Sequence, residues 1–196
     1  MTAAPCRPPE STEEIIKIYK VDPQIPRRDQ AELQQTIDEF HAQPGIQKIL
    51  KTLKANTEQY LILNRSPESG YGYYAKLGVP KGTPLLAYVG ALKPAQAVLG
   101  NHDMALGKIN AGYDLVVCGS LDTGGLQLVN HACGDRANCE IPDDGLYCPQ
   151  TGLSVLFVQT KRAIVSGEQI LFSYQKEVTR TSFWQREQDL PRVPRG

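Results

Sequence analysis

The sequence has no excess of charge of either sign. Its 196 residues carry 21 lysines and arginines against 21 aspartates and glutamates, so the formal net charge is zero. A balanced chain has no overall field that would attract nucleic acid or an anionic membrane surface. No apolar run comes near the roughly 20 residues of a membrane-spanning helix, and residues 1–6 lack the basic and apolar regions of a secretory signal. We therefore expect no direct contact with nucleic acid and no membrane anchor.

Cysteines are few and do not form a metal-binding pattern. There are five, an odd number without the density of a disulfide framework, which favours free thiols in a reducing compartment. Cys133, Cys139 and Cys148 are close in sequence, but five and eight residues separate them, more than the roughly two to four residues of a zinc knuckle. No fourth ligand is evident, so we expect no metal site.

The N-terminal segment, residues 1–60, is predicted to be helical. Residues 11–14 read as a capping box ahead of a short helix over 15–19. Apolar residues then recur at helical spacing over 28–43 and again over 46–56. These helices could pack on the chain's own core, cover a site as a lid, form a homodimer or bind a partner. The sequence leaves these roles open.

From Leu61 onward the pattern is that of a β-rich domain. Short apolar runs alternate with turn residues such as Gly and Pro, which is typical of many short strands in small sheets. We place this domain at 61–178 and a C-terminal tail at 179–196. The strands predicted from the runs are 61–63, 73–75, 85–89, 115–118, 126–129, 153–158 and 163–165.

Two short segments in the second half of the chain carry the most informative motif. The first signature segment begins Asn130-His131-Ala132-Cys133 and includes Asn138-Cys139; the second, residues 167–174, reads Gly-Glu-Gln-Ile-Leu-Phe-Ser-Tyr. Upstream lie Gly-Tyr-Gly at 70–72, Val-Pro-Lys-Gly-Thr at 79–83 and Tyr-Val-Gly at 88–90. In this order the segments resemble the SET domain, the fold of most protein lysine methyltransferases, over about residues 61–185.

The resemblance implies a fold and a cofactor. The fold is mainly β with α: several small curved sheets, with a pseudoknot-like crossing where the chain near the second signature segment passes under a preceding loop. The cofactor is S-adenosyl-L-methionine. The sequence departs from the family at Cys133 to Asn138, which is two residues longer than the family's Cys-x-Pro-Asn and lacks its proline. The path of this loop and the role of Asn138 stay open, and the family's zinc-binding cysteine tail is missing after Cys148.

Methyl transfer to a lysine requires a neutral amine, a linear approach and little competing water, so an aromatic channel serves it better than an acid–base pair. Tyr174 matches the family's catalytic tyrosine, whose hydroxyl is expected beside the transferring methyl. Phe172 matches a position that carries Phe or Tyr, and phenylalanine there implies di- or trimethylation. Tyr113 matches a further tyrosine of the lysine channel. The predicted channel is thus Tyr113, Phe172 and Tyr174.

The resemblance also assigns the cofactor contacts. The Gly-x-Gly loop is expected to wrap the methionine end, where glycine lets the backbone approach closely, and Trp184 or Phe183 of the tail is expected to stack on the adenine. Taken alone, each such residue also has an ordinary structural role in a turn, a core or a strand. The predicted cofactor-binding residues are Gly70, Tyr71, Gly72, Tyr113, Asn130, His131, Tyr174 and Trp184.

Two functions from different classes remain. The first is a protein lysine methyltransferase acting on a histone tail or another lysine-bearing protein, recognised at a strand edge by residues 90–112. The second is a SET-like module that binds a partner without catalysis; the altered loop favours it mildly, and the retained signature residues oppose it. A nucleic-acid-binding domain fits poorly, because the only basic face is a modest one, formed by Lys48, Lys51 and Lys54. We expect a cytoplasmic or nuclear protein, or, for a bacterial source, one delivered to a host cell.

Overall fold

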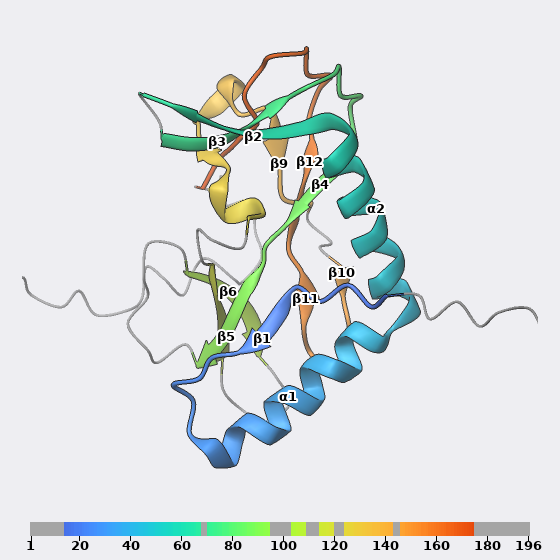
Figure 1. The fold of residues 1–196 in the computed structure, drawn as a ribbon, viewed down its shortest axis with the longest axis vertical. Coiled ribbons are helices and arrows are strands. Elements are labelled where there is room, and N and C mark those ends of the chain that lie inside the picture. The colour runs from blue at the N-terminus through green and yellow to red at the C-terminus, as the bar shows by residue number, and fades with distance from the viewer. Residues whose placement is uncertain are drawn as a thin grey trace, which may run out of the picture.

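A computed structural model describes residues 14–67, 70–94, 103–108, 114–119, 124–142 and 146–174 (Figure 1). Two helices dominate the N-terminal part: α1 (Arg27–Ala42) and α2 (Pro44–Tyr60). Figure 1 shows α1 along the lower edge of the molecule and α2 along its right side. The two helices predicted over 28–43 and 46–56 are therefore confirmed.

The apolar periodicity of the helices explains their packing. Leu33, Ile37 and Phe40 of α1 are all buried, at spacings of four and three residues, so they lie on one face of the helix. Pro44 occupies the first turn of α2, where the N–H that proline lacks would have no partner within the helix. The chain therefore ends one helix and begins the next with a single residue between them.

The short helix predicted over residues 15–19 is wrong. Instead, strand β1 (Tyr19–Val21) pairs in parallel with β5 (Gly90–Pro94). The Tyr19 side chain is buried, and its hydroxyl donates a hydrogen bond of 2.6 Å to the Ser154 carbonyl oxygen. The partner strand lies about seventy residues away in the sequence, so this pairing overrides the local capping pattern.

The described strands form two larger sheets and two hairpins. The larger sheets have the orders β1-β5-β7-β6 and β4-β12-β9-β13-β8, and the hairpins are β2-β3 and β10-β11. This arrangement confirms the predicted fold class of several small sheets preceded by helices. The remaining strands are β2 (Leu61–Ser66), β3 (Gly70–Ala75), β4 (Pro84–Ala87), β6 (Asp103–Lys108), β7 (Asp114–Gly119), β8 (Asn130–His131), β9 (Cys139–Glu140), β10 (Leu146–Tyr147), β11 (Ser154–Val155), β12 (Phe157–Thr160) and β13 (Leu171–Phe172).

Two predicted strands differ in the structure. Residues 126–129 are mostly a 3-10 helix, η2 (Leu126–Leu128), in which every residue is buried. A short, fully buried apolar run looks the same in either conformation, so its pattern could not separate them. Residues 163–165 contribute only an isolated bridge between Ile164 and Val79. The stretch 90–112, predicted as a substrate-binding insert, contains strands β5 and β6.

Helix α2 covers the free edge of β4, as Figure 1 shows on the right of the view. The Asn56 side-chain amide donates to the Pro84 carbonyl oxygen at 2.9 Å, and the Leu86 N–H donates to the Thr57 hydroxyl at 3.2 Å. These side chains satisfy backbone groups that would otherwise form an open sheet edge. The helix is thus joined to the β domain by hydrogen bonds as well as by its apolar face. No helix in the described ranges combines the length and the hydropathy that crossing a membrane requires.

Candidate active site

Strand β13 brings the two signature segments together. It pairs in parallel with β8, Leu171 opposite Asn130 and Phe172 opposite His131, and on its other side Phe172 pairs with Cys139 of β9. Strands β8 and β9 are consecutive in the chain, yet the later strand β13 lies between them. The loop that joins them therefore crosses β13, as the resemblance implied.

The loop that departs from the family pattern makes one short helical turn. Residues Gly134–Arg136 form a 3-10 helix, η3, and Gly134 adopts a positive φ of 59° that favours glycine. The chain then returns to the core at Asn138, whose side chain is fully buried. The longer loop thus still delivers an asparagine to the crossing, and this settles the path that the sequence left open.

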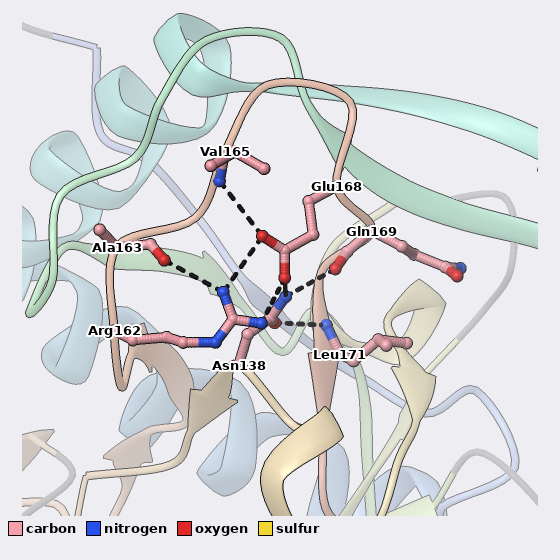
Figure 2. Close-up of polar contacts among 7 residues, drawn as sticks. All are labelled: Asn138, Arg162, Ala163, Val165, Glu168, Gln169 and Leu171. Atoms are coloured by element: carbon pink, nitrogen blue, oxygen red, sulfur yellow. Dashed lines mark hydrogen bonds and ion pairs between the residues drawn. The ribbon is translucent and has the colours of Figure 1, made fainter.

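Asn138 joins the loop to the second signature segment through its side-chain amide, as Figure 2 shows, and through its backbone N–H. Its side-chain amide donates to Glu168 Oε1 at 3.0 Å and to the Gln169 carbonyl oxygen at 2.7 Å. Its side-chain oxygen accepts the Leu171 N–H at 2.8 Å. Its backbone N–H donates to the Leu171 carbonyl oxygen, and its own carbonyl accepts from the Lys161 N–H. One buried side chain therefore fixes the entry of β13 into the sheet.

Glu168 is held in turn by Arg162. The guanidinium contacts both carboxylate oxygens, with Nη1 3.1 Å from Oε2 and Nη2 close to Oε1, and the Val165 N–H donates to Oε2 at 3.2 Å (Figure 2). Hydrogen bonding by Arg162, against a smaller opposing effect of burial, lowers the pKa of Glu168 to about 2. Glu168 is thus a carboxylate at neutral pH, and its role in this structure is to organise the crossing.

Tyr174 lies just after β13 and is fixed at both of its polar ends. Its hydroxyl donates to the Val129 carbonyl oxygen at 2.6 Å, and its backbone N–H donates to His131 Nδ1 at 3.0 Å. Its ring centroid is 4.9 Å from that of His131 and 4.9 Å from that of Phe172. Half of the side chain is exposed, and partial burial raises the pKa of its hydroxyl. The structure therefore brings together three of the predicted site residues, with the rings of His131 and Phe172 against the ring of Tyr174.

The Gly-x-Gly strand lies against the same place. The Asn130 side-chain amide donates to the Tyr71 carbonyl oxygen at 3.1 Å. A Cβ atom at Gly72 would stand 2.5 Å from Gln169 Nε2 and 2.8 Å from Asn130 Nδ2, so a side chain there would displace both amides. Gly70 has a φ of 70° and open space where a Cβ would point, and the Tyr71 side chain is exposed. Amides from both signature segments thus meet the glycine strand.

The other polar groups near the crossing have separate environments. His131 Nδ1 accepts the Tyr174 N–H, and its Nε2 lies 3.1 Å from the exposed Cys133 thiol. Burial raises the pKa of the Cys139 thiol to about 12. Within the ranges described, no three His, Cys, Asp or Glu side chains gather as a metal-binding group.

Tyr113 and Trp184 lie outside the described residues. An open cavity of about 350 Å³ lies elsewhere, between α2, β4 and the residues before β1, and none of the predicted site residues that the structure describes lines it. Sequence reasoning also missed Arg162 and the role of Asn138. Arg162 carries no motif of its own, and only the folded chain shows that it meets Glu168.

Comparisons with known proteins agree with this architecture. No family model matches the chain. It is 30% identical, over 113 residues, to the histone-lysine N-methyltransferase ash1 of Drosophila melanogaster; the match covers 55% of this chain and 5% of that protein. Among solved structures, ATXR5 in complex with mono-methylated histone H3.1 matches with a TM-score of 0.52 and 16% identity over 69% of each chain.

A second similar structure is described as a SET domain. The ATXR5 SET domain in complex with di-methylated histone H3 matches with a TM-score of 0.51 and 17% identity over 67% of each chain. The chain therefore has the SET-domain fold. It spans only a small part of the curated relative that it matches.

Proposed function

We propose that this protein is an S-adenosylmethionine-dependent protein lysine N-methyltransferase. The observation that carries the proposal is the convergence of Tyr174, Phe172 and the Asn130-His131 pair at the crossing of β13. These residues come from segments about forty positions apart, and each matches the signature at its own position. The SET-domain fold shared with the ATXR5 structure and the sequence similarity to the histone-lysine N-methyltransferase ash1 support the proposal.

The residues at this place suit the cofactor. Gly70 leaves its backbone open to a ligand, Tyr71 and His131 are exposed, and Tyr174 is half-exposed. When bound, S-adenosylmethionine supplies a methyl group on a positively charged sulfur. The residues of this chain that would hold it are Gly70, Tyr71, Gly72, Asn130 and His131, with Trp184, Phe183 and Tyr113 as further proposed contacts.

Tyr174 would orient the lysine amine. Its hydroxyl proton is engaged by the Val129 carbonyl, which leaves the oxygen lone pairs free to accept an N–H of the amine. Burial raises the pKa of this hydroxyl, so it stays protonated and uncharged at physiological pH. The fixed oxygen thus aligns the nitrogen for an in-line approach.

Phe172 would set the number of methyl groups. Its side chain is buried and packs against the Tyr174 ring, and it carries no hydroxyl that could hold a water molecule beside the amine. The space left free would accept a mono- or dimethylated lysine, so we propose di- or trimethylation. A histone tail is the substrate we would test first, because the ATXR5 structures contain histone H3.

Mass spectrometry tests this function. The protein is incubated with S-adenosylmethionine and either purified histones or cell lysate, in parallel with Tyr174→Phe, Phe172→Tyr and the control Tyr147→Phe, which alters an exposed tyrosine. We expect two or three methyl groups on lysines with the wild type and the control, and a loss of about a hundredfold or more with Tyr174→Phe. Phe172→Tyr should restrict the product to one methyl group.

Either part of the proposal can fail separately. If the wild type adds single methyl groups only, the argument from Phe172 is wrong while the enzyme stands. If no substrate is methylated and S-adenosylmethionine does not raise the unfolding temperature, the protein is the non-catalytic binding module. A saturating ligand at about 100 times its dissociation constant adds about 2.7 kcal/mol to the free energy of unfolding, so binding would be visible.

A further inference from the structure

A continuous set of contacts runs from the surface ion pair of Arg162 and Glu168 to Tyr174. Glu168 and the Gln169 carbonyl accept both amide protons of Asn138, and Asn138 then accepts the Leu171 N–H (Figure 2). Three residues after Leu171, the chain reaches Tyr174. Each step along this path is a hydrogen bond or a covalent connection.

The Asn138 amide has only one orientation that fits its neighbours. Its NH₂ group faces two acceptors, and its oxygen faces the Leu171 N–H. Turning the amide over would place its NH₂ group against the Leu171 N–H, and its oxygen against two acceptors, Glu168 Oε1 and the Gln169 carbonyl oxygen. Glu168 supplies one of the two acceptors, and it can do so in this position because Arg162 binds both of its oxygens.

The far end of the path shows what this orientation controls. The Leu171 N–H and carbonyl are both bonded to Asn138, which sets how far β13 enters between β8 and β9. The Phe172 carbonyl accepts the Ala132 N–H, and the Tyr174 N–H then meets His131. A shift of β13 along its neighbours would therefore move Tyr174 relative to both His131 and Val129.

We propose that Arg162 and Glu168 are positioning residues for Tyr174: their ion pair orients Asn138, and Asn138 sets the register of β13. This inference rests on the proposed function for its catalytic consequence, but the position of Tyr174 is measurable without any activity. Neither Arg162 nor Glu168 contacts Tyr174 among the interactions of the described residues, so they act through Asn138 and β13.

The test compares Glu168→Gln with Glu58→Gln, which removes the carboxylate of the exposed Lys54–Glu58 pair. The protein is labelled with ¹⁵N-tyrosine, so its nine tyrosines give a short spectrum in which Tyr174→Phe identifies the Tyr174 amide. Spectra are recorded well below the unfolding temperature, where a merely stabilising pair would leave the folded signals unchanged. Arg162→Lys serves as a second variant that keeps the charge but loses the two-pronged contact.

We expect the Tyr174 amide signal to move by more than its linewidth in Glu168→Gln and in Arg162→Lys, and to stay in place in Glu58→Gln. In methyl-transfer assays kcat should fall on the order of tenfold or more in the two positioning variants, as expected for a small misplacement of a reacting group. The KM for the protein substrate should change less than about twofold, because ground-state contacts are not removed.

An unmoved Tyr174 signal in a folded Glu168→Gln or Arg162→Lys protein would overturn the proposal, whatever happens to stability. A moved signal with unchanged kcat would also overturn it, since the pair would then not position a group that matters for transfer. If the wild type transfers no methyl group, the proposed function fails, and the Tyr174 signal alone decides whether the ion pair positions this residue. The two failures are therefore distinguishable.

Discussion

Replacing Asn138 by alanine should strongly destabilise the protein, because this buried side chain holds the crossing together. The substitution removes three side-chain hydrogen bonds, two donated and one accepted, and leaves the Leu171 N–H and the Gln169 carbonyl without partners. An unsatisfied buried group costs about 1–3 kcal/mol, and the second, partly buried group adds about 1 kcal/mol. We expect a loss of about 3 kcal/mol in the free energy of unfolding.

The assay is urea unfolding followed by circular dichroism, with Asn56→Ala as the matched control. Asn56 makes one partly buried hydrogen bond, to the Pro84 carbonyl, so its loss should cost about 1 kcal/mol. For a chain of this size, 3 kcal/mol corresponds to a fall of about 6–12 °C in the unfolding temperature. The slope of free energy against urea should stay the same in both variants, because the surface exposed on unfolding is similar.

Asn138→Asp sharpens the test. Aspartate has nearly the same shape, but it would direct an acceptor oxygen at Glu168 Oε1 and at the Gln169 carbonyl, where asparagine directs its NH₂ group. At neutral pH this substitution should cost at least as much as alanine. A cost for Asn138→Ala no larger than that for Asn56→Ala, or an Asn138→Asp protein as stable as the wild type, would refute the view that this amide holds the crossing together.

Two further predictions concern titratable groups. The pKa of Glu168 falls from 4.5 to about 2 on folding, so its contribution to stability is complete above about pH 4.5 and is lost as the pH falls towards 2. In urea unfolding from pH 6 to pH 2.5, Glu168→Gln should therefore lose less of its free energy of unfolding than the wild type. An equal loss in both proteins would contradict this. Cys133 is exposed whereas Cys139 and Cys148 are buried. A thiol reagent followed by peptide mapping should therefore label Cys133 in the native protein, and Cys139 and Cys148 only after unfolding. Labelling of Cys139 in the native protein as fast as Cys133 would show that the crossing opens readily.

Local patterns were enough for the parts of this protein that depend on nearby residues. Apolar spacing predicted both long helices, since a buried face repeats within a few positions. The run of short apolar segments predicted small sheets, and the order of the signature segments predicted the SET-domain fold. The same resemblance placed Phe172 and Tyr174 in one channel, and His131 and Tyr174 among the cofactor contacts. The roles of these residues in cofactor binding and methyl transfer stay predictions.

Where a segment's partner lies far away in the sequence, the local pattern failed. Residues 15–19 carry a helix-like start, yet Tyr19 enters a strand because β5 offers a parallel partner there. Residues 126–129 are apolar enough for a strand, but between buried neighbours they turn as a 3-10 helix. Neither the β5 partner of Tyr19 nor the buried surroundings of residues 126–129 can be seen in the few neighbouring residues on which a local pattern is based.

The sequence by itself determined which residues could build the site; the tertiary structure decided which of them do so and what holds them. Asn138, Arg162 and Glu168 are an ordinary asparagine and a charged pair until β13 passes between β8 and β9. Only then does Asn138 meet the pair, because a crossing joins distant segments by hydrogen bonds whose partners have no fixed spacing in the chain. The residues around Tyr174 therefore come from two local motifs, but their geometry depends on the contact of Asn138 with the Arg162–Glu168 pair, which neither motif predicts by itself.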